Sequence, residues 1–214
     1  MKKVFLTLFA AAFAVSFSIA QKVGTADVTQ TGSDNNADIS QVTSGGNANA
    51  IVNQSVGNAT ANIEQIQNAS AGGDLDATVN QQGNNLADVF QKNRNSDVIV
   101  NQINTGGAAG ALNEAYVSQG ENAGAVVGAR ANVRQEGEGN FVDVDQDRIN
   151  APFSHRADLD QIGNNNSIAL QQDGSAPGDG AEATVRQEGN DNVFEGLDGG
   201  DQAFQGSSSF IDAG

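Results

Sequence analysis

Apolar and polar residues alternate along most of this chain in short runs that end on glutamine. The stretch QTGSDNNADISQ at 30–41 begins and ends on this residue, and QEGEGNFVDVDQ at 135–146 and QIGNNNSIALQQ at 161–172 repeat the arrangement. Alternation with a period of two predicts β-strands. The glutamines that mark the register are Gln30, Gln41, Gln54, Gln65, Gln81, Gln91, Gln102, Gln119, Gln135, Gln146, Gln161, Gln172 and Gln187.

An aliphatic residue stands two positions before each of these glutamines, and alanine or another aliphatic residue stands four positions before. The residues between them are mostly Asp, Asn, Ser and Thr, so each strand has an apolar face that ends in Gln and a polar face. The aliphatic residues of the predicted core are Val28, Ile39, Val52, Ile63, Val79, Val89, Val100, Val117, Val133, Val144, Leu159, Leu170 and Val185. Four residues break the pattern on the polar face: Ile51, Phe90, Ile99 and Tyr116.

The spacing of the glutamines predicts tight and loose arcs between the strands. Several short steps carry Gly two residues after the glutamine and Asn three residues later. Gly reaches positive φ without steric cost, and Asn tolerates this conformation. Both prolines fall in long steps, outside every predicted strand. The tight-arc residues are Gly32, Gly137, Gly163 and Gly189, with Asn35, Asn140, Asn166 and Asn192.

Two short strands cannot bury their own apolar face, but a stack of similar units can. We therefore predict an all-β fold, a β-solenoid of about seven stacked strand–arc–strand rungs with amyloid-like cross-β order. At ~4.8 Å per rung the rod is roughly 34 Å long. Both steps around Gln119 are long, so residues 102–135 are predicted to form a wide or broken rung.

The buried glutamines need hydrogen-bond partners, because a buried amide without them costs ~1–3 kcal/mol. At the rung spacing, each side-chain NH₂ can donate to the side-chain carbonyl of the next rung. We predict a structural amide ladder made of the register glutamines and the four arc asparagines. Shifting a strand by one residue would bury Asp and expose Val, so the pattern specifies one register.

The repeated unit is similar to the curlin repeat of curli, a bacterial functional amyloid, whose pattern is Q-x-G-x-x-N-x-A-x-x-x-Q. Residues 30–41 match it at every fixed position. The copies at 135–146 and 161–172 match except that Val142 and Ile168 replace Ala. Many of the long arcs lack the Gly and Asn, and they are longer than the usual turns of the family.

The resemblance covers roughly residues 23–198. It implies a secreted structural subunit of extracellular fibres in the biofilm matrix, active in adhesion and aggregation at the bacterial cell surface. It also implies export through an outer-membrane secretion channel and a nucleator subunit that seeds the fibre. The acidic chain and the regular repeat favour a major subunit.

The N-terminus predicts a signal peptide at residues 1–20. Lys2 and Lys3 precede an apolar run, and Ser18, Ile19 and Ala20 provide the small residues typical of a cleavage site before Gln21. Outside this leader, no run is apolar enough to span a bilayer. We expect the repeat solenoid at 21–198 and a C-terminal tail at 199–214.

The charge and composition of the chain limit the kinds of molecule that it can bind and the bonds that can stabilise it. The chain has 214 residues, no cysteine and a formal net charge of −16, which changes to −18 without the two leader lysines. This field repels nucleic acid and anionic lipid. Export would permit disulfides, but there are no cysteines to form them. Gly, Asn, Gln, Ala and Ser dominate, and it is their order, not their abundance, that predicts a fold.

An enzyme on a parallel β-helix would need clustered acids, bases or cations. The single histidine, His155, lies in a long arc next to Pro152 and reads as a loop residue. The segment DVDQD at 143–147 resembles the start of a calcium loop but has Arg148 at the position that requires Gly. The segment GGDLD at 72–76 is similar to calcium-binding β-roll repeats, but it does not recur at a fixed period. We predict no catalytic, cofactor-binding or metal site.

An open solenoid exposes strand edges at both ends, and head-to-tail stacking gives an open filament. We therefore expect homopolymer fibres, in which outward Asp and Glu oppose lateral association. The alternative is a monomeric secreted β-solenoid that acts as an adhesin or binding protein.

Overall fold

The computed structural model describes most of the repeat region and parts of both ends. The described residues are 4–8, 14–20, 24–43, 46–67, 73–92, 96–120, 129–146, 156–171, 182–194 and 208–213. Side chains are described from Gly24 to Phe194 within these ranges. The predicted ladder residue Gln172 and the predicted loop residue His155 lie outside them.

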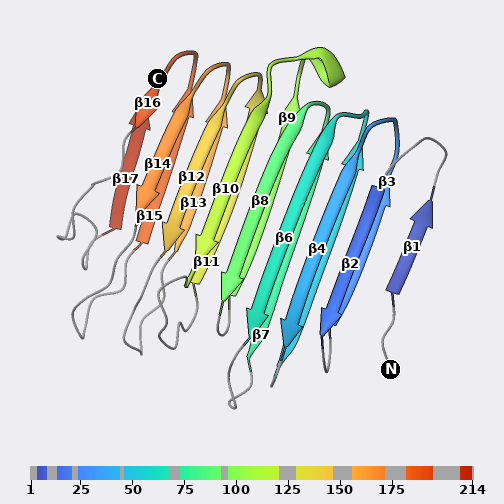
Figure 1. Ribbon diagram of the computed structural model, residues 1–214. Helices are drawn as coiled ribbons and strands as arrows, with labels where there is room; N and C mark the ends of the chain where they lie inside the picture. The colour runs from blue at the N-terminus through green and yellow to red at the C-terminus, as the bar shows by residue number, and fades with distance from the viewer. Residues whose placement is uncertain are drawn as a thin grey trace.

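Two parallel sheets lie face to face and build a β-solenoid (Figure 1), as predicted from the alternation. Successive strands of the chain belong to opposite sheets, and the chain advances steadily from one end of the stack to the other (Figure 1). From β3 to β16 the described strands form seven rungs, each made of one strand of the odd-numbered sheet and the following strand of the even-numbered sheet, close to the number predicted.

The odd sheet contains, in order, β1 (Val4–Leu8), β3 (Gly24–Gln30), β5 (Asn47–Ser55), β7 (Asp74–Gln82), β9 (Ser96–Asn104), β11 (Ala129–Gly137), β13 (Ala157–Ile162), β15 (Glu182–Glu188) and β17 (Ser208–Ala213). The even sheet contains β2 (Ala14–Ala20), β4 (Asn36–Thr43), β6 (Ala59–Gln67), β8 (Asn85–Lys92), β10 (Asn113–Gln119), β12 (Phe141–Gln146), β14 (Ser167–Gln171) and β16 (Val193–Phe194).

A thin aliphatic seam fills the space between the sheets. All the predicted core residues are at most 3% exposed, and they stack in register from strand to strand. Val28 pairs with Val52, which pairs with Val79, while Ile39 pairs with Ile63 in the opposite sheet. Each buried side chain of this size contributes ~1.5–3 kcal/mol relative to an exposed one, so the seam supplies the main driving force for stacking.

The rung at 102–135 is not broken, which corrects part of the prediction. Strand β10 pairs in register with β8 and with β12, and Gln119 stands opposite both Gln91 and Gln146. The extra residues of the step from Gln102 to Gln119 lie in the arc between β9 and β10, which contains a short 3-10 helix, η1 (Gly107–Ala109), seen as a coil at the edge of the stack (Figure 1). This long step therefore widens an arc without disturbing the backbone pairing of the strands.

The backbone of both chain ends extends the sheets. Strands β1 and β2, within the predicted leader, pair with β3 and β4. Strand β17, within the predicted tail, pairs with β15. Within the described part of the chain, no helix has the length and apolar character that a membrane span requires.

Candidate functional site: two columns of buried amides

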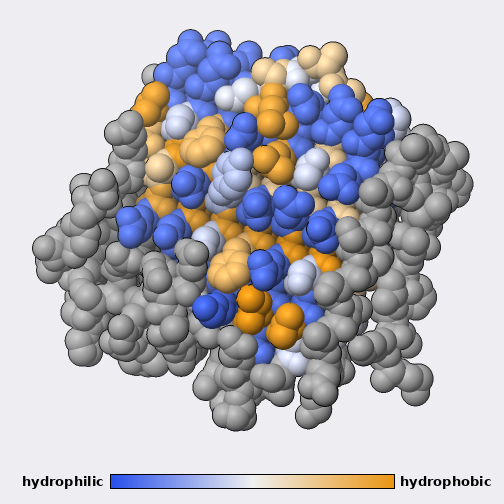
Figure 2. All heavy atoms as spheres, in the orientation of Figure 1, coloured by the Kyte–Doolittle hydropathy of each residue, from blue (hydrophilic) through white to orange (hydrophobic). Residues whose placement is uncertain are grey.

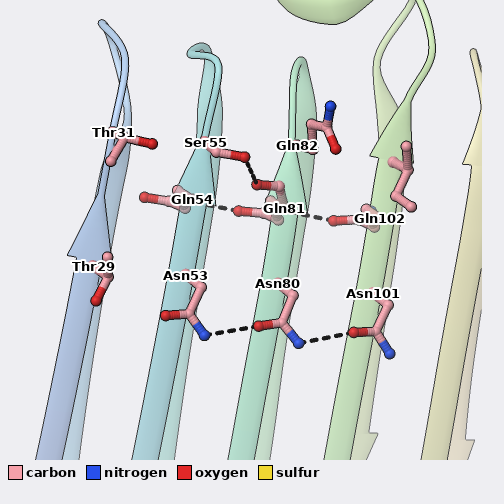
Figure 3. Close-up of a pocket in the computed structure, with 11 residues that line it drawn as sticks. Thr29, Thr31, Asn53, Gln54, Ser55, Asn80, Gln81, Gln82, Asn101 and Gln102 are labelled. Atoms are coloured by element: carbon pink, nitrogen blue, oxygen red, sulfur yellow. Dashed lines mark hydrogen bonds between the residues drawn. The ribbon is translucent and has the colours of Figure 1, made fainter.

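The glutamines of the odd sheet form one continuous column of side-chain hydrogen bonds along the stack. In every step the Nε2 of one glutamine donates to the Oε1 of the glutamine in the following odd strand. Part of the column appears in Figure 3, where Gln54, Gln81 and Gln102 follow one another across β5, β7 and β9. The bonds are Gln30 to Gln54 at 2.6 Å, Gln54 to Gln81 at 2.9 Å, Gln81 to Gln102 at 2.9 Å, Gln102 to Gln135 at 2.8 Å, Gln135 to Gln161 at 2.9 Å and Gln161 to Gln187 at 3.0 Å.

A second bond from these amides fixes their direction. The Nε2 of Gln54 also donates to the backbone carbonyl of Asn36 at 2.8 Å, and the Nε2 of Gln135 donates to that of Glu114 at 3.0 Å. A carbonyl only accepts, so the nitrogen of each amide must face the opposite sheet. The column therefore has a polarity, with donors directed toward the C-terminal end of the stack.

The even sheet has a second column, and this one is interrupted. Gln41 donates to Gln65 at 2.8 Å, Gln65 to Gln91 at 2.8 Å and Gln91 to Gln119 at 3.4 Å. Within the described residues, the Oε1 of Gln146 is buried and accepts no hydrogen bond. The column thus stops between Gln119 and Gln146, although their backbones are paired.

The interruption coincides with a serine from the opposite sheet. The hydroxyl of Ser96, at the start of β9, donates to the Oε1 of Gln119. Ser96 is fully buried and stands in register with Leu75 and Ala129, where neighbouring rungs have no hydroxyl. We attribute the break to this contact, because it holds the Gln119 amide, whose Nε2 reaches only the backbone carbonyl of Asp97 at 3.5 Å.

The first amide of each described column has a buried acceptor without a partner. The Oε1 atoms of Gln30 and Gln41 accept no hydrogen bond among the described residues. The strand positions opposite them are Leu8 in β1 and Ile19 in β2, residue types without an amide. The N-terminal end of both columns is therefore an acceptor end.

The arc asparagines differ from the predicted ladder. Instead of bonding one another, they link side chain to backbone. The Oδ1 of Asn140 accepts from the backbone N–H of Asn166 at 3.0 Å, and its Nδ2 donates to the carbonyl of Gly163 at 2.8 Å. Asn35 and Asn166 are buried in the same way, whereas Asn192 lies half-exposed at the end of the column. Their role is to satisfy the backbone of the tight arcs.

Two further buried arc asparagines were not predicted from the sequence. Asn85 and Asn113 are fully buried, and the Nδ2 of Asn113 donates to the Oδ1 of Asn85 at 3.0 Å. They were missed because the spacing was counted from the preceding glutamine, and their arcs differ in length. Counting six residues back from the glutamine of the even strand finds both of them, together with the predicted Asn35, Asn140 and Asn166.

The tight-arc glycines have the positive φ that was predicted. Gly137 has a φ of 125° and Gly163 a φ of 115°. A Cβ atom on Gly137 would collide with the carbonyl oxygen of Gly163, and one on Gly163 with that of Gly189. These glycines are therefore required by two features at once: the backbone conformation of the arc and the close stacking of one arc on the next.

The outer faces carry the charge and a few apolar side chains. Figure 2 shows hydrophilic and hydrophobic residues mixed on the face toward the viewer. On the even sheet, Tyr116 stands between Asp88 and Asp143 in register, and its ring centroid lies 5.9 Å from that of Phe141. Burial raises the pKa of Asp88 and Asp143, and burial followed by the hydrogen bond to Glu114 raises the pKa of Tyr116.

The described aspartates of the two segments that resemble calcium-binding sequences lie on β7 and β12. Asp143 and Asp145 alternate with the buried Val142 and Val144 on the outer face of β12, as expected for a strand. Asp97 on β9 has a raised pKa because of burial and the nearby charge of Asp76. Among the residues that the structure describes, no three metal-ligating side chains lie together.

A groove lies on the outer face of the odd sheet (Figure 3). It has a volume of about 320 Å³ and crosses the ends of β3, β5, β7 and β9. One bank is a row of outward amides, in which Asn53 donates to Asn80 and Asn80 to Asn101, both at 2.8 Å. The solenoid therefore has an outer, solvent-accessible amide ladder as well as the two buried ones.

Comparisons of the chain with family models, with curated proteins and with solved structures find no significant match.

Proposed function

We propose that this chain is a structural subunit that self-assembles head to tail into extracellular, curli-like amyloid fibres. The fibres would form part of a bacterial biofilm matrix and serve in adhesion and aggregation. The proposal includes removal of residues 1–20, export through an outer-membrane channel and seeding by a nucleator subunit. It rests on the repeat and its resemblance to curlin, and on the chemistry of the two ends of the solenoid.

The observation that carries the proposal is the polarity of the amide columns. At the N-terminal end, the Oε1 atoms of Gln30 and Gln41 are buried acceptors without a described partner. Gln187 is the last described glutamine of the odd column. Its Oε1 accepts from Gln161, and its Nε2 donates to the backbone carbonyl of Ser167. The odd sheet continues past Gln187 to β17, where Ala213 stands opposite it, and the even sheet ends at β16. A second copy stacked head to tail would pair with these edge strands, and its amide columns would run in the same direction.

The outer faces support linear growth over lateral clumping. Carboxylates recur on the outward positions of both sheets, and the formal net charge of the chain is −16. Like charges repel side-by-side association, whereas the ends of the rod carry the unpaired strand edges. Growth along the axis is thus the favoured mode of association.

The test uses the chain without residues 1–20, incubated from a freshly purified monomer. We expect thioflavin-positive filaments by electron microscopy and fibre diffraction with reflections near ~4.7 Å and ~10 Å. A protein that stays monomeric and gives neither reflection would contradict the proposal and favour the monomeric adhesin or binding protein.

A pair of variants tests the end chemistry. The double variant Gln30→Leu/Gln41→Leu removes both acceptors at the N-terminal end, and we expect it to slow seeded elongation. The matched control is Gln146→Leu, because the Oε1 of Gln146 also lacks a described partner but lies inside the stack. Equal elongation rates for the two proteins would show that the end amides do not guide stacking.

A further inference from the structure

The outer groove of the odd sheet is uncharged, in a strongly acidic chain. Its first bank is Thr29 and the amide row Asn53, Asn80 and Asn101, and its second bank includes Ser55, Gln82 and Ile103. Gln54, Gln81 and Gln102 point into the core, so their main chain forms the floor. A groove of this size is within the range that holds small ligands, ~300–1,000 Å³.

In β11 and β15, ion pairs occupy the positions that continue the two banks of the groove. In the register of the sheet, Asn101 is followed by Arg134 and Ile103 by Glu136. Arg134 and Glu136 form an ion pair across the line of the groove, and Arg134 also bonds Asp160 at 3.0 Å. In β15, Arg186 and Glu188 repeat this bridge at 3.0 Å. The same two rows are therefore neutral and open over β3–β9 but charged and bridged farther along the stack.

The amide row retains hydrogen-bonding capacity. In the ladder, Asn80 uses one N–H and one lone pair of its side chain, Asn53 uses one N–H and Asn101 uses one lone pair. An amide has two N–H groups and two lone pairs. The free donor and acceptor of Asn53, Asn80 and Asn101 recur at the strand spacing of ~4.8 Å. All three side chains reach solvent, with Asn53 exposed and the other two half-buried. A matching ligand needs paired hydroxyl or amide groups that repeat at about the same distance.

We propose that this groove binds a neutral, linear β-linked glycan, lying along the axis of the solenoid across β3–β9. The sugar units of an extended β-linked chain repeat at nearly the spacing of the strands, so each unit meets one rung. The hydroxyls bond the amide row, and the C–H faces of the rings pack on the floor and on Ile103. The absence of charge along both banks excludes ionic recognition and selects against charged polymers. The site belongs to a single subunit, so binding does not depend on fibre formation.

The test is calorimetric titration of the soluble, full-length chain with cellopentaose, a neutral β-linked glucose oligomer. Pentagalacturonate and pentaglucosamine serve as the anionic and cationic counterparts. We expect cellopentaose to bind and the two charged oligomers to bind more weakly. Failure of cellopentaose to bind, or equal binding of a charged oligomer, would overturn the proposal.

Variants then locate the site. Asn80→Asp puts a carboxylate in the middle of the amide row and removes a donor, so we expect the affinity for cellopentaose to fall about tenfold or more. Asn62→Asp is the matched control, since it makes the same change at a half-buried outward position of β6 on the far sheet. Ser55→Phe fills the groove without a charge and should also abolish binding.

Circular dichroism of each variant separates loss of the site from loss of the fold. If Asn80→Asp does not fold, the decision rests on Ser55→Phe. Unchanged affinity in a folded groove variant, or equal weakening by Asn62→Asp, would show that the glycan binds elsewhere. Because every titration uses unassembled protein, these outcomes are independent of whether the chain forms fibres.

Discussion

The two amide columns have the same residue type, the same spacing and the same burial, yet only one is continuous. The odd column makes six consecutive side-chain bonds from Gln30 to Gln187. The even column makes three and stops at Gln119, whose Oε1 also accepts from the Ser96 hydroxyl and whose Nε2 donates to the backbone carbonyl of Asp97. The strands nevertheless stay in register through the break.

This difference separates two roles that the repeat combines. Backbone pairing and the aliphatic seam are sufficient to hold the register, because Val117 still stands opposite Val144 where the amides do not bond. The amides add stability and a direction to a stack that these two features already align. Substitutions in the two columns should therefore have unequal effects.

The largest effect is expected from a substitution in a tight arc, the segment that joins a strand of the odd sheet to the next strand of the even sheet. Gly163 lies in the arc from β13 to β14, and Gly163→Ala would combine an unfavourable φ with a backbone clash against Gly189. We expect a loss of about 3 kcal/mol or more in the free energy of unfolding, measured by urea titration of the monomer. Gly189→Ala is the matched control, since its φ of 108° is similar but its Cβ would meet only Asn192 at 3.5 Å. Equal losses would show that arc stacking adds nothing to the cost of the φ angle.

The next largest effect compares one glutamine from each column. Gln102→Leu removes donations to Gln135 and to the carbonyl of Leu86, and leaves the Gln81 amide without its acceptor. We expect it to cost about 2–3 kcal/mol. Gln146→Leu loses one described bond, to the carbonyl of Arg130 at 2.9 Å, and should cost about 1 kcal/mol or less. Urea midpoints of the two variants measure the difference, and a larger loss for Gln146→Leu would contradict the comparison.

A smaller effect is expected from repairing the even column. Ser96→Ala removes the hydroxyl that holds Gln119 and matches Ala129 in the next rung. The Gln119 amide can then donate to Gln146, so stability should change by no more than ~0.5 kcal/mol. The sensitive measurement is hydrogen exchange of the Gln119 side-chain NH₂ by NMR, which should slow. Faster exchange would show that the serine supports the column.

The smallest effect concerns pH and the outer faces. Burial raises the pKa of Asp88 and Asp143 above the ordinary value, so the folded state binds protons more readily than the unfolded chain does. Their contribution to stability is complete below the ordinary pKa and is lost as the pH rises through the raised one. Stability should therefore increase slightly from these groups on acidification, and Asp88→Asn/Asp143→Asn should flatten this slope. An unchanged slope in urea titrations at several pH values would assign it to other carboxyls.

Much of the fold could be predicted because its information is local. Val52 and Gln54 face the core since they alternate with polar neighbours, and the structure buries both. The glycine arcs were predictable for the same reason, from a short motif with a fixed conformation. The buried Asn85 and Asn113 were missed, because the arc lengths vary and only the distance to the following glutamine is constant.

The sequence by itself determined which residues form strands, which face is buried and that glutamines end each buried run, because a period of two is a property of neighbouring residues. Only the tertiary structure decided the direction of the amide columns, the break at Gln119 and the position of the outer groove. Each of these depends on which atoms from different rungs or opposite sheets come within hydrogen-bonding distance. Such contacts join residues 18 or more positions apart, and no local pattern encodes them.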